Sequence, residues 1–234
     1  MNNIEMFQQM LEMQDEINTI VNPDWKQAHY PWHRAVWTEC SELVEHFGFK
    51  WWKYQEPHWD QIILEIVDIY HFGMSMLLMM KSTPTEIAED LDIHYTEVIQ
   101  THTLDPSLFV EKVEVLAGTA TTGVFDTVTF FDVMLTANID VSLLFSMYVG
   151  KNVLNKFRQA NGYKDGTYRK VWSDGREDNE HLTDIMNPSN LKLLQSGELI
   201  GYIYESLLYE YHITEAGQLG VAPVDDLVVY SNGC

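Results

Sequence analysis

Cysteine, positive charge and strand-like patterning are the scarce features of this 234-residue sequence. Cys40 and Cys234 are its two cysteines, too few for a disulfide scaffold, which favours a reducing compartment such as the cytoplasm. Fourteen lysine and arginine residues stand against 35 acids, for a net charge of −21. This balance disfavours binding of duplex nucleic acid or of an anionic membrane through a basic surface.

Two further absences concern membranes and export. The N-terminus has no basic segment followed by an apolar run, so we expect no signal peptide. The apolar run from Gly73 to Met80 is too short and too close to charges to span a bilayer. We therefore expect a soluble cytoplasmic protein with no membrane partner.

The apolar residues that are present recur mostly at helical spacing, and strand-like alternation is rare. With 46% hydrophobic residues, the chain is long enough to bury a real core. Residues 173–187 are polar and turn-rich, which predicts surface or a lid. The sequence therefore predicts an all-α protein, with one kinked helix or two within 108–135 and further helices at 3–21, 31–47, 57–80, 85–102, 151–161 and 189–212.

Four acids form two pairs of equal spacing, Glu39-x-x-Glu42 and Glu65-x-x-Asp68. Residues three apart lie on one face of a helix, so each pair can direct two carboxylates at one point. Apolar residues surround the second pair on nearly all sides, and a bare buried carboxylate is very costly. Four neighbouring acids need a proton or a cation, and an all-oxygen set favours Mg²⁺, or Mn²⁺, over zinc. His71, three residues after Asp68, is either a further ligand or a wall of the pocket.

An apolar stripe on the first helix continues as two amides. Phe7, Leu11, Gln14 and Asn18 follow at i, i+4, i+7 and i+11. The spacing alone favours a solvated edge for the two amides. The alternative is that they offer donors and acceptors to the edge of a planar base, with Trp25 packed close by.

Positive charge is concentrated in two places. Lys50-Trp51-Trp52-Lys53 follows the first acid pair and is either a hydrophobic plug with lysines at its rim or a phosphate and base contact. The second place is the block of residues 151–176. Ion pairing with nearby acids is the ordinary explanation for this block, but cations beside a four-acid metal site would also suit a polyphosphate. The block holds half of the cations, namely Lys151, Lys156, Arg158, Lys164, Arg169, Lys170 and Arg176.

Taken in order, these features resemble the dimeric, all-α dUTPase family, which is related to the other all-α NTP pyrophosphatases. The paired acids alone fit the whole superfamily, whereas the amides and the basic block point to the dUTPase branch. Residues 83–140 and those beyond 212 match none of its motifs. The motifs are Gln14-x-x-x-Asn18 with Asn22-Pro23-x-Trp25, Glu39-x-x-Glu42, Lys50-Trp51-Trp52-Lys53, Glu65-x-x-Asp68-x-x-His71-Phe72, Lys151-Asn152-x-Leu154-Asn155-x-Phe157-Arg158 and Gly162-Tyr163-Lys164-x-Gly166-x-Tyr168.

The resemblance implies a multi-helix bundle that forms a homodimer. It implies a single domain over residues 1–234, in which residues 83–140 are a candidate inserted helical subdomain and 213–234 a C-terminal tail. The implied reaction is Mg²⁺-dependent attack of water at the α-phosphorus of dUTP, or dUDP, giving dUMP and pyrophosphate or phosphate.

Residue roles follow from the same resemblance. The acids Glu39, Glu42, Glu65 and Asp68 would bind the metal, with Glu42 as general base. The substrate would be bound at the pyrimidine by Gln14, Asn18 and Trp25, at the deoxyribose by Asp68, His71 and Phe72, and at the phosphates by Lys151, Asn155, Arg158, Lys164 and Lys170, with Lys53 as a further phosphate or base contact.

Three alternatives stay open from the sequence. A side-chain amide can flip, so Gln14 and Asn18 could equally serve cytosine, as in a dCTP or mixed dCTP/dUTP pyrophosphatase. A di-metal helical bundle of the ferritin type would need two Glu-x-x-His pairs, and only Asp68-x-x-His71 approaches one. A non-catalytic nucleotide-binding protein is the third.

One position departs from the family pattern. Tyr70 stands where many members of the family have tryptophan.

Overall fold

The computed structural model describes residues 1–80, 82–187 and 196–218. In these ranges the regular elements are helices, and one isolated bridge pairs Val171 with Glu177. The all-α prediction is confirmed. The helices are α1 (Asn3–Val21), α2 (Trp32–Phe47), α3 (Trp59–Met79), α4 (Pro84–Thr101), the 3₁₀ turn η1 (Pro106–Leu108), α5 (Phe109–Thr121), α6 (Thr127–Thr136), α7 (Val141–Ala160), α8 (Asp178–Ile185) and α10 (Ser196–Gln218).

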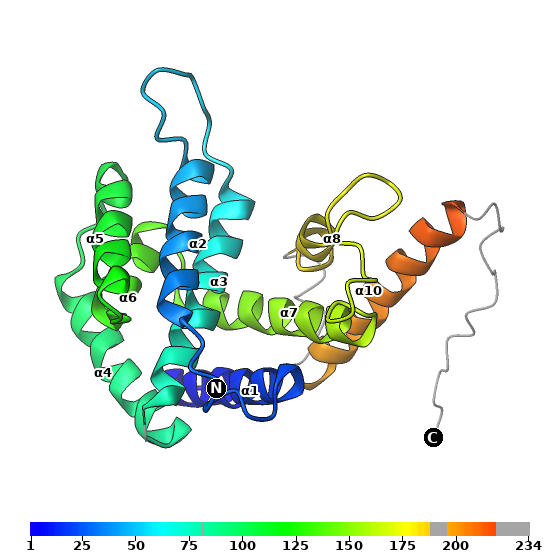
Figure 1. Cartoon of the computed structure of the whole chain (residues 1–234). Helices are drawn as coiled ribbons and strands as arrows, with labels where there is room; N and C mark the ends of the chain where they lie inside the picture. Colours follow the sequence, from blue (N-terminus) through cyan, green and yellow to red (C-terminus); the bar gives the residue numbers. More distant parts are fainter. Residues whose placement is uncertain (81, 188–195, 219–234) are drawn as a thin grey trace. The chain divides into compact units, whose positions relative to one another are not determined.

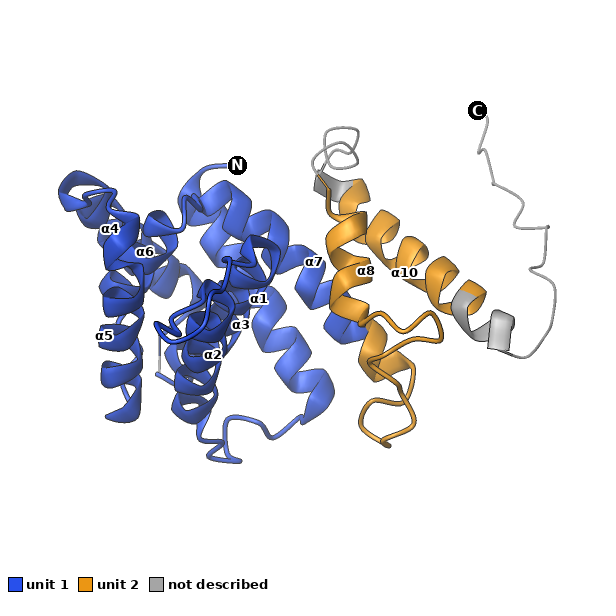
Figure 2. Cartoon of the chain, turned by 90° about the horizontal axis from the view of Figure 1, so that it is seen from above, with its two compact units in different colours: residues 1–156 blue, residues 157–234 orange. Residues whose placement is uncertain are grey.

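The chain divides into two compact units, Met1–Lys156 and Phe157–Cys234, which are coloured separately in Figure 2. Unit 1 holds α1 to α6 and most of α7, and unit 2 holds the end of α7 together with α8 and α10. The single-domain organisation expected from the resemblance stays a prediction.

Unit 1 is built around the pair α2 and α3, which run side by side and are joined by a connector that projects beyond them (Figure 1). The helix α5 packs against α2, α4 packs against α1, and α6 contacts both α4 and α5. Residues 83–140 thus pack on α1 and α2 within unit 1. Their origin as an insertion stays a prediction.

Local signals explain where several helices begin and end. A capping box joins Asn2 to Glu5 at the start of α1, and Thr83 and Glu86 form the same arrangement before α4, whose first residue is Pro84. The helix α2 ends at Gly48, which has a φ of 87° and so occupies the left-handed region that glycine tolerates best. These boundaries follow the sequence closely.

The helix α3 is the core helix of unit 1. Tyr70 is fully buried and its ring stacks on Phe130 with centroids 5.0 Å apart. By length and composition α3 could cross a membrane, but 67% of its most apolar window is buried inside the protein. Packing in the core therefore accounts for its apolar character.

The expectation for residues 173–187 holds in part: most of them are partly or fully exposed, but they include α8, which presents an inward face. Asp178, His181 and Leu182 of this helix are buried. Its buried polar residues pair with other polar groups, as described for Asp178 below.

The prediction for the last helix concerns α10. Its expected core residues Leu199, Ile203 and Leu207 are buried as predicted, while Leu191 and Leu194 lie outside the described residues.

Candidate metal and nucleotide site

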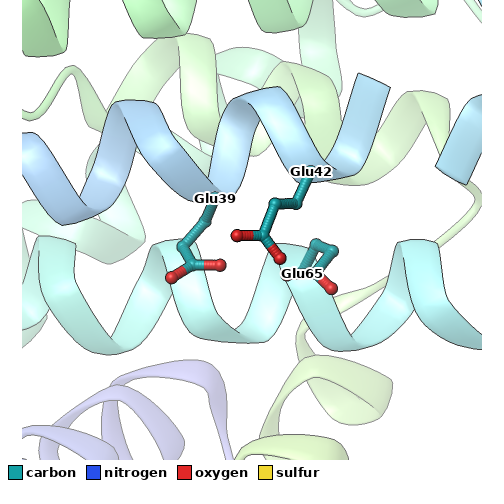
Figure 3. Close-up of side chains that lie close together, drawn as sticks. All are labelled: Glu39, Glu42 and Glu65. Carbon is teal, nitrogen blue, oxygen red and sulfur yellow. The ribbon is translucent and has the colours of Figure 1, made fainter. Parts of the chain in front are cut away.

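Three carboxylates from the two predicted acid pairs meet between α2 and α3. One oxygen each of Glu39, Glu42 and Glu65 lies within 4.8 Å of the others, and Figure 3 shows the two side chains of α2 directed toward α3. Glu42 is exposed, Glu39 is half-buried and Glu65 is buried. A set of carboxylate oxygens alone, without sulfur or nitrogen, fits Mg²⁺ or Mn²⁺.

The electrostatics of this group also favour a cation. Burial is the first cause that raises the pKa of both Glu39 and Glu65, and the negative charge of Asp68 is the second. The two side chains share a hydrogen bond, so one proton can serve both. Without a cation, the cluster therefore holds protons that an isolated glutamate would have lost at neutral pH.

Asp68 lies one turn after Glu65 on α3 but stands apart from the group of three. Its Oδ2 pairs with Nζ of Lys151 at 2.8 Å, and Lys151 is only 2% exposed. This buried ion pair ties α7 to the acid cluster. A further neighbour was not expected from the sequence: His46 Nε2 lies 3.5 Å from Glu65 Oε1. The sequence feature that could have indicated His46 is its position one turn after Glu42 on the same helix.

The two amides of α1 are buried, so the solvated-edge interpretation is wrong. Gln14 is 4% exposed and Asn18 is 7% exposed. The Gln14 amide nitrogen donates to Asn18 Oδ1 at 3.0 Å and to Ser75 Oγ at 3.1 Å. Its carbonyl oxygen accepts from the Tyr148 hydroxyl at 3.1 Å and lies 2.6 Å from His71 Nδ1. Gln14 thereby uses its full hydrogen-bonding capacity inside the protein.

His71 belongs to this buried polar cluster. Its ring stacks on Tyr148 at 4.3 Å, and burial lowers its pKa to about 4, so the imidazole is neutral at pH 7. With Nδ1 bound to Gln14, the Nε2 atom is buried and has no hydrogen-bond partner within the described structure. A bound ligand with an O–H or N–H group would satisfy it.

Three aromatic side chains, Trp25, Trp32 and Phe72, lie next to one another. Trp25 is 2% exposed, and its indole nitrogen donates to Asp15 at 3.2 Å. The partly exposed Trp32, which the sequence analysis did not single out, lies between Trp25 and Phe72, with ring centroids 6.0 and 6.2 Å away. Trp25 is thus the buried member of this group, and Trp32 and Phe72 are partly exposed.

Comparison with known proteins decides the family. A family model described as dUTPase matches residues 6–163, more than half of the chain. The chain belongs to the dUTPase family. It is thus an enzyme of nucleotide metabolism, a hydrolase of the dUTP diphosphatase kind. A search of curated proteins gave no match.

The matched range contains every residue of this dUTPase site described so far, including the ion pair to Lys151 and the hydrogen bond from Tyr148. It stops at Tyr163, one residue before Lys164. The predicted phosphate contacts at Lys164 and Lys170 therefore have no support from the family match.

The connector between α2 and α3 does not form a hydrophobic plug in this structure. Trp51 is 90% exposed, Trp52 59% and Tyr54 84%. Lys53 is exposed as well, and Lys50 pairs with Glu45. The connector is thus free of the core, and the phosphate or base contact of Lys53 stays a prediction.

The basic block is divided between the two units. Lys151 and Asn155 belong to unit 1, and Arg158, Lys164 and Lys170 belong to unit 2. Lys164 and Lys170 are exposed. The roles of all five residues in binding phosphate stay predictions.

Arg158 has a buried acidic partner within unit 2. Its Nε and Nη2 atoms donate to the two carboxylate oxygens of Asp178, each at 2.8 Å. The Tyr168 hydroxyl donates to Asp178 Oδ2 at 2.8 Å, and the Trp172 indole donates to Tyr168 at 3.2 Å. A fork of this kind fixes the guanidinium firmly, because both of its hydrogen bonds are charge-assisted.

Sequence reasoning missed Ser75, Tyr148 and Asn152, all of which lie around the amide pair. Asn152 donates to the backbone oxygen of Met13 at 3.3 Å and to the Tyr148 hydroxyl at 3.4 Å. A weak signal existed for each: Ser75 is four residues after His71, and Tyr148 and Asn152 flank Lys151 on α7. The prediction of the site would have included these residues if it had also counted polar residues one helical turn from a predicted site residue on a buried helix face.

Proposed function

We propose that the chain hydrolyses dUTP, and dUDP, to dUMP in a Mg²⁺-dependent reaction in which water attacks the α-phosphorus. One observation carries the proposal beyond family membership. The helix α3 contributes both to a three-carboxylate group, through Glu65, and to the hydrogen bonds of the buried amide pair of α1, through His71 and Ser75. The first suits a metal-bound polyphosphate and the second suits the edge of a base.

Asn18 is the amide that reads the base, and Gln14 orients it. Gln14 has both N–H groups and both carbonyl lone pairs engaged within the protein. Asn18 uses one N–H toward Ser75 and one lone pair toward Gln14, which leaves one donor and one acceptor for a ligand. Adjacent donor and acceptor groups match the N3–H and carbonyl of uracil.

The acids hold the metal and prepare the water. Glu39, Glu42 and Glu65, together with Asp68 one turn further along α3, would hold Mg²⁺, or Mn²⁺, which when bound lowers the pKa of coordinated water and offsets phosphate charge. Glu42 is the member of the group that is open to solvent, so it can take a proton from water and release it again. This supports Glu42 as general base.

Asp68, His71 and Phe72 line the deoxyribose in this proposal. The unpartnered Nε2 atom of His71 accepts a hydrogen bond from a sugar hydroxyl, and the ring of Phe72 leaves no polar partner for a 2′-hydroxyl. Lys53, Lys151, Asn155, Arg158, Lys164 and Lys170 hold the phosphates and stabilise the leaving group.

The same proposal includes the setting of the enzyme. We take it to act as a homodimer in the cytoplasm, on a free deoxyuridine nucleotide and without a nucleic-acid or membrane partner. The net charge of −21 supports the last two points, since a general basic surface is lacking. Size-exclusion chromatography with light scattering tests the dimer directly.

The deciding experiment measures product release from dUTP, dUDP, dCTP, dTTP and UTP with Mg²⁺. It compares the wild type with Asp68→Ala and with Asp60→Ala, which removes an exposed acid from the first turn of the same helix. We expect turnover of dUTP and dUDP, a loss of at least about tenfold in Asp68→Ala and near wild-type activity in Asp60→Ala.

Each other outcome is informative. Equal or better turnover of dCTP would assign the enzyme to the dCTP or mixed pyrophosphatases. Full activity of Asp68→Ala would refute the role of this acid. No metal-dependent turnover of any of the five nucleotides would refute the proposed reaction.

A further inference from the structure

Ser75 lies at the centre of the hydrogen bonds that hold the two amides. It is fully buried on α3, and its hydroxyl donates to the backbone oxygen of His71 at 3.0 Å. Its oxygen accepts from Gln14 Nε2 at 3.1 Å and from Asn18 Nδ2 at 3.0 Å. One hydroxyl thus contacts both amides and one backbone carbonyl.

This arrangement leaves Ser75 no freedom of direction. A backbone carbonyl can only accept, so the single hydroxyl hydrogen must point to His71. The amide atoms that face Ser75 must then be N–H groups, since an oxygen there would meet a lone pair. Gln14 and Asn18 are therefore prevented from flipping, although an isolated amide has no such constraint.

The fixed direction extends through the rest of the cluster. The nitrogen of Asn18 faces Ser75, so its oxygen receives the second N–H of Gln14. The oxygen of Gln14 must face away from Ser75, where it receives the Tyr148 hydroxyl and the His71 ring nitrogen. Nδ1 of His71 must then carry the hydrogen, and in the neutral ring Nε2 presents a lone pair.

We propose that Ser75 is a positioning residue that sets the hydrogen-bond polarity of Gln14 and Asn18, and so determines how strictly the enzyme discriminates between uracil and cytosine. The proposal rests on the function proposed above. Ser75 itself does not touch the base. It acts because Asn18 presents its remaining donor and acceptor in one order while the serine hydroxyl is present.

The first test compares Ser75→Ala with Ser146→Ala. Ser146 makes the same hydroxyl contact with the carbonyl four residues earlier, at 2.9 Å to Ser142, but lies outside the amide cluster. The measured quantity is the ratio of kcat/KM for dUTP over dCTP. In Ser75→Ala we expect this ratio to move toward one by about tenfold, equivalent to about 1.4 kcal/mol, while Mg²⁺ affinity and the Ser146→Ala ratio stay unchanged.

A purely structural role for Ser75 predicts something different. It would lower kcat/KM for dUTP and dCTP by the same factor and leave the ratio intact, and that result would overturn the proposal. A wild type that hydrolyses neither nucleotide would instead refute the proposed function, which is a separate outcome.

The second test is a measurement on the wild-type protein, and it uses a variant only to assign signals. Long-range ¹H–¹⁵N NMR of the wild-type imidazoles reports which ring nitrogen carries the hydrogen, with the His71 signals assigned by their loss in His71→Asn. We expect the Nδ1–H form for His71. Finding the Nε2–H form would show that the polarity runs the other way, and the proposal would fall whether or not the protein turns over nucleotides.

Discussion

Gly73 and Gly118 form a matched pair for testing how tightly α3 is packed. Both are helical glycines, and replacing a helical glycine by alanine ordinarily stabilises a helix by about 1 kcal/mol. At Gly118, in α5, an added Cβ atom meets nothing within 4 Å. At Gly73, in α3, it would lie 2.3 Å from Cζ of Phe125.

The magnitudes follow from these contacts. Gly118→Ala should raise the free energy of unfolding by up to about 1 kcal/mol. Gly73→Ala gains the same propensity but must displace a ring that is 6% exposed and packs 5.4 Å from Phe130. Overpacking of this kind costs about 1–3 kcal/mol, occasionally more, so after the propensity gain we expect a net destabilisation of up to about 2 kcal/mol.

Urea unfolding followed by circular dichroism measures both changes. Phe125→Ala removes the obstructing ring, so adding Gly73→Ala in that background should become neutral or stabilising, as at Gly118. A Gly73→Ala protein at least as stable as the wild type would refute the packing argument. So would an equal loss on adding Gly73→Ala to wild type and to Phe125→Ala.

Three further predictions concern buried polar groups. The Tyr70 hydroxyl is buried with no hydrogen-bond partner in the described part of the chain. Removing it in Tyr70→Phe should therefore raise the free energy of unfolding by about 1 kcal/mol. A lower stability of Tyr70→Phe in urea unfolding would show that the hydroxyl has a partner. The pKa of His71 falls to about 4 on folding, so below pH 6.5 the unfolded chain binds more protons than the folded one. The free energy of unfolding should therefore fall by up to about 3 kcal/mol as the pH drops from 6.5 to 4. It should depend less steeply on pH in His71→Asn, and an equal pH dependence in the two proteins would contradict the burial argument. Burial and Asp68 raise the pKa of Glu39 and Glu65, so Mg²⁺ must displace protons and should bind more tightly as the pH rises from about 6 to about 8. Calorimetry in two buffers of different ionisation enthalpy measures that proton release, and a pH-independent affinity without release would exclude these acids as ligands.

The acid cluster was predictable because its signal is local. Glu65 and Asp68 interrupt a helix that is otherwise apolar on almost every side, and buried carboxylates there require a partner or a cation. The three-residue spacing was enough to place Glu39 and Glu42 on one face of α2, and the helix pair then brought the two sets together.

The amide pair shows where sequence reasoning stopped. Spacing alone favoured solvent for Gln14 and Asn18, because an unpaired amide is costly to bury. Their actual partners lie 61 residues away at Ser75 and 134 residues away at Tyr148. No local pattern reports such contacts, although the family resemblance predicted a role for the two amides.

The same limit explains why the expectation for residues 173–187 holds only in part. Asp178 reads as a surface residue in a polar segment, but Arg158 and Tyr168, 20 and 10 residues before it, satisfy its carboxylate and allow it to be buried. A charged residue is buried where the fold supplies it with a partner, so its environment depends on residues that are distant in the sequence.

A single turn of α7 connects the parts of unit 1 that bear on chemistry. Tyr148 holds Gln14, Asn152 holds the backbone of Met13, and between them Lys151 holds Asp68. These contacts join α7 to segments made much earlier during synthesis, since the hydrogen bond from Asn152 to Met13 spans 139 residues. While the ribosome is still building the chain, the three glutamates and the Ser75 contacts of the two amides can already be present, but the hydrogen bonds from Tyr148 and Asn152 and the Asp68 ion pair cannot form until residue 152 has emerged. The order of synthesis thus delays these contacts of α7 until most of the chain has been made.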